Sequence, residues 1–347
     1  MNAAIQPGQQ VPGADTRIET IDMHTGGEPV RIVTKGYPAI SGGTILEKRR
    51  FARDHLDAFR RLIMFEPRGH YDMYGVLPVA PDLPGADMAV LFIHNEGYST
   101  MCGHATIALG RYALDQGMIK AGADSMARLN LQCPCGLVEV SVAASGPDKG
   151  RVSFISVPAF AFALDVVIDL PGKGKVTLDI GYGGAFYAFL PAGVFGLDVR
   201  SSPTGELVAA ASAVTRAVQA QVKLHHPDDP DLAFLYGTIL TDGGDGASGP
   251  TANICVFAAN EVDRSPTGSG VTARLALMAA RGEIADQAWR QFESVTGAIF
   301  QGRVASHLRT GEFPAIRAEV AGRAYYTGRA SFTVEPEDPL AGGFLLR

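Results

Sequence analysis

One passage of the chain occurs twice, and this internal repeat constrains the fold more than any other feature of the sequence. A constant offset of 165 residues aligns the two copies. Because the offset is close to half of the 347 residues, the repeat predicts two lobes of similar structure. A chain of this length can bury two cores of moderate size. The aligned pairs are Phe92 and Phe257, Asn95 and Asn260, Glu96 and Glu261, Gly103 and Gly268, and Gly117 and Gly282.

The two copies differ at the one position where chemistry is expected. The first copy has Cys102, and the second has Thr267 at the aligned position. A duplicated fold with a thiol in one half and a hydroxyl in the other indicates an active site that was once symmetric and now relies on one half.

The segments around each repeat predict an α+β fold. Most apolar segments are short, rich in Val, Ile and Phe, and bounded by glycines, which is typical of strands joined by tight turns. Four other segments predict helices, over 44–66, 103–117, 206–223 and 268–281. We expect two pseudo-symmetric lobes, each a mixed sheet wrapped around the central helix that follows the repeat, with the active site between the lobes. The last strands are expected at 315–321 and 324–334.

The domain boundaries follow from the repeat. We expect a first lobe over 17–174, a second over 175–324, and a hinge near Gly174. Residues 325–347 are expected to form a C-terminal strand segment that can return to the first lobe. Residues 1–16 have neither the basic nor the apolar region of a secretory signal, so they are interpreted as a disordered lead-in.

Composition excludes several classes of function. The net charge of −6 and the lack of a basic stripe argue against nucleic acid as a partner. No apolar run approaches the length of a membrane span, so no membrane partner is expected. Without an export signal, the four cysteines are expected to be reduced and the protein to be cytoplasmic.

Both repeats place their key residue in a turn just before a helix. The first backbone N–H groups of a helix have no internal partner and, with the helix dipole, form an anion site. Residues small or polar enough to admit a carboxylate follow at each site, namely Gly103, His104, Gly268 and Ser269. The same field is expected to lower the pKa of Cys102, which makes its thiolate a base toward a carbon acid. We therefore expect a substrate with a carboxylate.

The other polar residues of the repeat have either a binding role or a structural role. Asp263 breaks the repeat, since its partner is Tyr98, and either binds a substrate ammonium or caps the turn; we favour the ammonium. The Asn and Glu residues at 95, 96, 260 and 261 are interpreted as side chains that hold the turns.

The remaining cysteines and histidines give weaker signals. Cys133 and Cys135 do not have the spacing of a zinc pair, so no metal site is expected there. Cys255 lies in an apolar strand and is interpreted as inert. His225 and His226 are interpreted as part of a solvated turn in which one histidine can face the pocket. His24 and His70 remain candidates for pocket residues.

Three motifs resemble those of one family. Residues 101–106 (MCGHAT) and 263–270 (DRSPTGSG) closely resemble the two signature motifs of the proline racemase family, and residues 22–29 (DMHTGGEP) resemble its opening. The resemblance covers the chain from about Thr16 onward. It implies the diaminopimelate-epimerase fold, a small imino-acid substrate and no metal or organic cofactor.

The second motif departs from the family pattern. Family racemases and epimerases have a cysteine in both motifs, so that one removes the Cα proton and the other returns a proton to the opposite face. With Thr267 in place of the second cysteine, the chain resembles the branch that dehydrates trans-3-hydroxy-L-proline to Δ1-pyrroline-2-carboxylate through the Δ2 enamine. By this resemblance Cys102 is the base, and the other site residues are Gly103, His104, Asp263, Thr267, Gly268 and Ser269.

Several alternatives stay open. A proline racemase or 4-hydroxyproline 2-epimerase is the second interpretation, and if the lobes are symmetric, Thr267→Cys should raise racemisation. A non-catalytic imino-acid binder is disfavoured by the presence of Cys102 and Asp263. A thiol redox protein is disfavoured by the lack of a resolving cysteine near Cys102. A homodimer is left open as the assembly.

Overall fold

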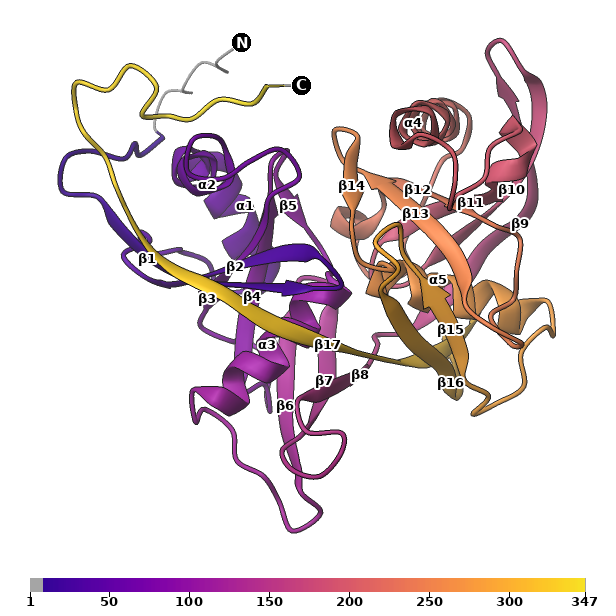
Figure 1. The fold of residues 1–347 in the computed structure, drawn as a ribbon, viewed down its shortest axis with the longest axis horizontal. Helices are drawn as coiled ribbons and strands as arrows, with labels where there is room; N and C mark the ends of the chain where they lie inside the picture. The colour runs from indigo at the N-terminus through magenta and orange to yellow at the C-terminus, as the bar shows by residue number, and fades with distance from the viewer. Residues whose placement is uncertain (1–8, 347) are drawn as a thin grey trace.

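The computed structural model describes residues 9–346, which form two lobes joined by a long strand (Figure 1). Of the expected lead-in, residues 1–8 lie outside the described residues. Residues 9–16 contain a turn, and the Gln10 N–H donates to the His55 carbonyl at 2.9 Å.

The first lobe surrounds helix α3. This helix packs against strands β1, β2, β6, β7 and β8, while α1 and α2 cover β4 on the other side. The elements are β1 (Arg17–Thr25), β2 (Glu28–Lys35), α1 (Ile45–His55), α2 (Asp57–Met64), β3 (Tyr74–Val79), β4 (Met88–His94), β5 (Tyr98–Ser99), α3 (Gly103–Asp115), β6 (Met126–Cys133), β7 (Gly136–Ala143) and β8 (Arg151–Ile155).

The second lobe surrounds helix α5 in the same way. Helix α5 packs against β9, β10, β11 and β16, and α4 covers β11, β12 and β13. The elements are β9 (Ala159–Leu170), β10 (Gly174–Tyr182), β11 (Phe186–Pro191), η1 (Ala192–Phe195), α4 (Thr204–Gln221), η2 (Pro230–Leu232), β12 (Leu235–Thr241), β13 (Thr251–Phe257), β14 (Glu261–Asp263), α5 (Gly268–Ala280), β15 (Arg290–Glu293), β16 (Ile299–Thr310) and β17 (Phe313–Thr333), which continues into the first lobe.

The two lobes repeat the same topology. The first contains the parallel pairs β2–β3 and β4–β6, and the second contains the parallel pairs β11–β12 and β13–β15 among otherwise antiparallel strands. Helices α3 and α5 each have 13 residues and keep the offset of the repeat. The expected α+β fold of two lobes with mixed sheets is confirmed.

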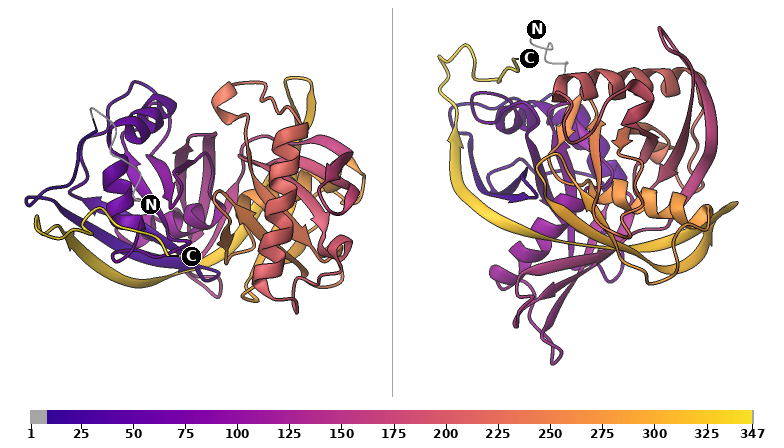
Figure 2. Two further views of the ribbon diagram at one scale, coloured as in Figure 1. Left: turned by 90° about the horizontal axis from the view of Figure 1, so that it is seen from above. Right: turned by 45° about the vertical axis from the view of Figure 1, so that its right-hand side comes forward.

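Strand β17 links the lobes. Its first residues pair with β16, β8 and β9, and residues 324–333 pair with β1. Figure 1 and both views of Figure 2 show this strand, drawn in yellow at its end, passing from one lobe to the other. The expectation of two separate strands here is wrong, because the ladder continues through Gly322 and Arg323, which pair with β8.

The chain passes between the lobes earlier than the sequence indicated. Gly174 begins β10 and pairs with Leu170 of β9, so it belongs to a hairpin of the second lobe and is no hinge. Strand β8 pairs with β7 and β9 with β10, which places the crossing at 156–158. The glycines at 172 and 174 have φ of 80° and 84°, so they serve the hairpin turn.

Two helices replace the single helix expected over 44–66. Thr44 caps α1 through a capping box with Glu47. Helix α1 ends at His55, and its C-cap residue Leu56 has a ψ of 10°, which is not helical. Helix α2 starts at Asp57. Leu56 is fully buried, and the break directs the apolar residues of α2, Phe59, Leu62 and Ile63, into the core.

Burial of α5 on all sides fixes the position of the site. Residues 268–278 are all buried, which is the behaviour of a helix enclosed by its sheet rather than lying on a surface. Its N-terminus lies against the first lobe, where Gly268 approaches Gly103. Within residues 9–346, no helix has the length and apolar character needed to cross a bilayer.

Candidate active site

A small cavity lies where the two lobes meet. Its walls include all seven residues that the sequence selected. Its volume is about 10 Å³, which is room for about one water molecule. The lobes or their side chains must therefore part to admit a ring-shaped substrate. The cavity is lined by Tyr74, Met101, Cys102, Gly103, His104, Tyr187, Tyr236, Cys255, Phe257, Asp263, Thr267, Gly268 and Ser269.

The N-termini of α3 and α5 meet at two glycines. A Cβ at Gly103 would lie 2.4 Å from Gly268 Cα, and a Cβ at Gly268 would lie 2.6 Å from Gly103 Cα. Only glycine permits this approach. The first free N–H groups of both helices consequently face one region, as an anion site shared by two helices requires.

Cys102 is the N-cap residue of α3. Its Sγ accepts a hydrogen bond from the Ala105 N–H at 3.3 Å and lies 3.1 Å from His104 Nδ1. Burial raises the pKa of the thiol well above its ordinary value, the Ala105 N–H lowers it by less, and Asp263 raises it. The expectation of a lowered pKa is wrong for this closed cavity, because desolvation outweighs the helix N-terminus.

His104 is held by the hairpin between β1 and β2. Thr25 Oγ1 donates to the His104 carbonyl at 2.9 Å, and the imidazole bonds the backbone of Pro29. Burial lowers the pKa of His104 to about 3, so the ring is neutral. A neutral imidazole that donates through one nitrogen accepts at the other, which fits the Cys102 S–H as donor.

Thr267 is the N-cap residue of α5, but its backbone differs from that of Cys102. Its φ is 65°, against −146° for Cys102, and its side chain does not cap the helix. A β-branched residue in this left-handed region is rare and strained. The buried Oγ1 has no hydrogen-bond partner among the described residues, although it lies near enough to Asp263 and Cys255 to lower the pKa of both.

Asp263 supplies a buried carboxylate. Its Oδ1 accepts from the Ser265 N–H at 2.7 Å, and its Oδ2 lies 3.9 Å from His104 Nδ1. Burial raises the pKa of Asp263 to about 6, and hydrogen bonds from Ser265 limit the rise. The carboxylate is therefore ionised at neutral pH and suited to a cationic nitrogen. Across the cavity, Ser269 Oγ bonds the Tyr187 hydroxyl at 2.8 Å.

Polar contacts outside the cavity hold the lobes together. The Arg264 guanidinium bonds Asp72 at 2.5 Å, and the backbone N–H of Arg264 donates to Glu28 Oε2 at 2.7 Å. His94 Nδ1 lies 3.2 Å from Glu261 Oε1. Burial, and to a lesser degree the Asp263 charge, raise the pKa of Glu28 well above its ordinary value, and Arg264 opposes the rise.

The sequence missed several cavity residues. Tyr74, Tyr187, Tyr236 and Phe257 lie in apolar strands, where nothing local distinguishes them from core residues. Cys255, interpreted as inert, also lines the cavity. Its only sequence signal is its place eight residues before Asp263, and the two are opposite each other on β13 and β14.

Other candidates lie elsewhere. His24 stacks on Tyr325, His70 bonds the Tyr71 carbonyl, His225 pairs with Glu312, and His226 packs on Tyr182; none lines the cavity. Cys133 and Cys135 are unpaired and outside it. The asparagines hold the turns: Asn95 Nδ2 donates to the Met64 carbonyl of α2, and Asn260 Oδ1 accepts from Ser212 of α4.

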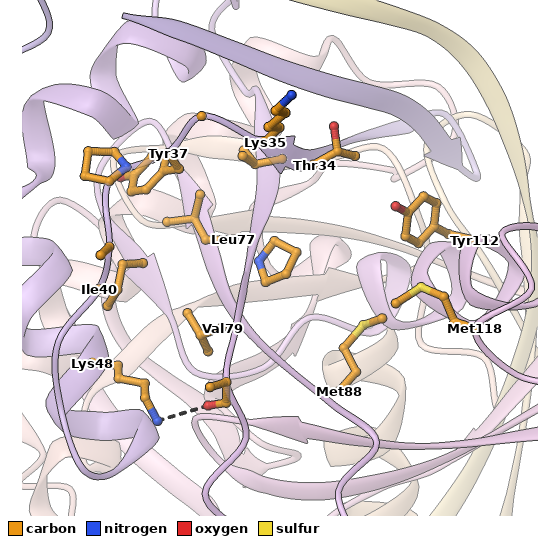
Figure 3. A pocket seen from close by; sticks show the side chains of 16 residues that line it. Thr34, Lys35, Tyr37, Ile40, Lys48, Leu77, Val79, Met88, Tyr112 and Met118 are labelled. Atoms are coloured by element: carbon orange, nitrogen blue, oxygen red, sulfur yellow. Dashed lines mark hydrogen bonds between the residues drawn. The ribbon is translucent and has the colours of Figure 1, made fainter.

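A roomier cavity in the first lobe is not the predicted site. It has a volume of about 470 Å³ and lies between the segment after β2, strand β3 and the C-terminal end of α3 (Figure 3). Lys48 at its edge donates to the Ala80 carbonyl at 3.0 Å. None of the seven predicted residues lines it, so cavity size alone does not identify the reaction site.

Comparison with known proteins identifies the family of this chain. The family model described as proline racemase matches residues 20–345. The chain belongs to the proline racemase family. It is 56% identical over 347 residues to the trans-L-3-hydroxyproline dehydratase of Xenopus tropicalis, a match that covers 99% of this chain and 100% of the relative. It is 57% identical over 335 residues to the trans-3-hydroxy-L-proline dehydratase of Homo sapiens, covering 95% of both.

Other relatives support the fold, and one of them has a different activity, epimerisation. A crystal structure of a "probable proline racemase" from Agrobacterium radiobacter, with bound carbonate, matches with a TM-score of 0.88 and 27% identity, and covers 95% of this chain and 96% of that one. A relative from Burkholderia multivorans, 42% identical over 330 residues, with 95% of this chain and 98% of the relative covered, is a 3-hydroxyproline 2-epimerase.

Proposed function

We propose that this protein is a hydro-lyase that dehydrates trans-3-hydroxy-L-proline to Δ1-pyrroline-2-carboxylate. One observation carries the proposal: of the two N-cap residues that meet across the cavity, Cys102 has a thiol and Thr267 does not. A threonine hydroxyl is too weak an acid to serve as the second acid or base of a racemase. The identity to curated dehydratases over nearly the whole chain supports the same reaction.

The substrate's groups match the groups in the cavity. The free N–H groups at the start of both helices, from Gly103, His104, Gly268 and Ser269, receive the carboxylate. The ionised Asp263 receives the ring ammonium. That ammonium also brings a positive charge near Cys102, which offsets the burial that opposes its thiolate.

The stereochemistry explains why one thiol is enough. In trans-3-hydroxy-L-proline the Cα hydrogen and the 3-hydroxyl both lie opposite the carboxylate, so they share a ring face. The Cys102 thiolate removes the Cα hydrogen as a proton, the electron pair forms the C2–C3 double bond, and the C3–O bond breaks. Hydroxide leaves with the proton from the Cys102 thiol as water, which restores the thiolate. The Δ2 enamine then tautomerises to the Δ1 product, and no metal or organic cofactor takes part.

The test follows three substrates in D₂O by NMR: trans-3-hydroxy-L-proline, trans-4-hydroxy-L-proline and L-proline. Loss of water from the first alone is expected, and inversion of either of the others without dehydration would refute the proposal. Cys102→Ser should lose at least about 10³-fold in kcat, since a hydroxyl cannot replace the thiolate base. Cys135→Ser is the matched control, because Cys135 is also unpaired and lies outside the cavity.

The second candidate is an epimerase or racemase, which needs a second acid on the opposite face. The 3-hydroxyproline 2-epimerase relative and the thiol of Cys255 in the cavity favour keeping it. Cys255 lies on β13, beside Thr267 at the start of α5. If the Cys255 thiol supplied the second proton, Cys255→Ser would abolish inversion and leave α-proton exchange. If the wild type gives no inversion, the epimerase or racemase function is excluded.

Location and assembly are also proposed. The four cysteines are unpaired in the structure, which supports a reducing compartment, the cytoplasm. A homodimer is proposed as the assembly, and sedimentation equilibrium would refute it if the mass were that of one chain of 36.6 kDa.

A further inference from the structure

Two tyrosines from different lobes face each other beside Cys102. Tyr74 of β3 lies with its ring 4.7 Å from the His104 ring, in an edge-to-face arrangement. Tyr236 of β12 stacks on Phe257 at 5.2 Å. Both line the small cavity, and both are buried. They therefore place two phenol hydroxyls on the Cys102 side of the site.

The two hydroxyls are in different states. The Tyr74 hydroxyl is close enough to Cys102 to lower the pKa of the thiol through a hydrogen bond, so this phenol is engaged with the base. The Tyr236 hydroxyl is buried and has no partner at hydrogen-bond distance in the described part of the chain, although the Ser99 and Tyr74 side chains lie near enough to interact with it electrostatically. Buried hydroxyls are as a rule hydrogen-bonded, so a donor that lines the cavity is available to a polar group of a substrate bound there.

The position of Tyr236 limits what that group can be. The tyrosine also lines a neighbouring cavity of about 280 Å³ with His94, Glu96 and Phe234, so its ring forms the wall between the two spaces. Burial raises the pKa of Tyr236 well above its ordinary value, with the nearby Tyr187 and Glu261 adding to the rise. The rise disfavours the phenolate, so the group in this wall is an O–H that can donate a hydrogen bond.

We propose that the Tyr236 hydroxyl binds the leaving group, by donating a hydrogen bond to the 3-hydroxyl oxygen of the substrate. This rests on the proposed dehydration. The carboxylate and ammonium are assigned to the helix N-termini and to Asp263, which leaves the 3-hydroxyl as the remaining polar group. It shares the ring face of the Cα hydrogen and so lies on the side of Cys102, where Tyr236 has its free donor. As the C3–O bond breaks, this donor stabilises the charge that develops on oxygen, while the proton that completes the water still comes from Cys102.

The test compares the two fates of the substrate after its Cα proton is removed, which are return of a proton to C2 and loss of water. Wild type and Tyr236→Phe are incubated with trans-3-hydroxy-L-proline in D₂O, and NMR follows both pyrroline product and deuterium at C2 of the recovered substrate. Dehydration by Tyr236→Phe should fall about 100-fold, as for loss of one preorganised donor, while C2 exchange persists. The ratio of exchange to dehydration should therefore rise by about the same factor.

The matched control is Tyr182→Phe. Tyr182 is also buried, and its hydroxyl has no partner among the described residues, but it lies outside the cavity. The ratio of C2 exchange to dehydration in Tyr182→Phe should therefore stay at the wild-type value. The inhibition constant of L-proline, which lacks the 3-hydroxyl, should be the same for wild type and Tyr236→Phe. If Tyr236→Phe fails to fold, the ratio of exchange to dehydration is measured for Tyr236→Leu instead.

The outcomes separate the two proposals. A wild type that releases no water from this substrate would refute the proposed function and the leaving-group role together. A dehydrating wild type whose Tyr236→Phe variant loses exchange and dehydration equally would refute the role of Tyr236 alone, because a merely structural residue affects both steps. An unchanged rate of dehydration in the variant would refute it as well.

Discussion

Replacing Gly103 with alanine should damage catalysis far more than folding. A Cβ at this position would lie 2.4 Å from Gly268 Cα, whereas ordinary contact begins at 3.4 Å. The N-termini of α3 and α5 must therefore separate by about 1 Å, and a misplacement of about 1 Å can cost about 10²-fold in rate. Overpacking of this kind costs about 1–3 kcal/mol of stability, which a protein of this size can tolerate.

The assay compares kcat/KM for dehydration with the free energy of unfolding in urea. Gly268→Ala should give the same result, because its Cβ would lie 2.6 Å from Gly103 Cα. Gly205→Ala is the control: Gly205 is an exposed residue of α4 with nothing within 4 Å of an added Cβ. This variant should keep full activity and gain up to about 1 kcal/mol from helix propensity. A Gly103→Ala variant within about threefold of wild-type kcat/KM would show that the contact between helices does not set the geometry of the site.

Two further predictions concern Asp263 and Thr267. The folded pKa of Asp263 is raised to about 6 from an ordinary value of 3.8, so its protonation favours folding as the pH falls and this contribution is lost as the pH rises through about 6. As the pH falls from about 7 to about 4.5, the unfolding free energy of the wild type, measured in urea, should rise by about 2 kcal/mol relative to that of Asp263→Asn. No difference between the two proteins would mean that the pKa of the Asp263 carboxyl is not raised. Thr267→Cys should give little inversion of L-proline, because its backbone does not direct a side chain as that of Cys102 does. Rapid inversion, seen by chiral chromatography, would contradict this.

Much of the site could be predicted because the repeat is a local pattern. Cys102, Thr267 and the glycines after them are adjacent in sequence, and a turn before a helix has the same meaning wherever it occurs. The α+β fold follows from the same repeat. Tyr74 and Tyr236 could not be found in this way, since each looks like a core residue until the two lobes bring them to one cavity.

Two of the wrong expectations have different physical causes. A helix N-terminus can be recognised from sequence, but the desolvation of Cys102 depends on how tightly both lobes close over it, and here it decides the direction of the pKa. The glycines near 174 looked like a hinge because a linker and a hairpin turn share the same composition. Only the pairing of Gly174 with Leu170 distinguishes them.

The N-termini of α3 and α5 are capped differently. In α3 the third N–H, that of Ala105, is occupied by Cys102 Sγ. In α5 no side chain caps the helix, because Thr267 adopts the left-handed conformation. The N-terminus of α5 therefore keeps more unpaired donors, and we propose that it binds more of the substrate carboxylate than α3, which presents the thiol. Since the Cα hydrogen lies opposite the carboxylate, this asymmetry directs the hydrogen toward Cys102. Thr267 thus differs from Cys102 in backbone conformation as well as in side chain, which fits a site with the base on one helix and substrate binding on the other.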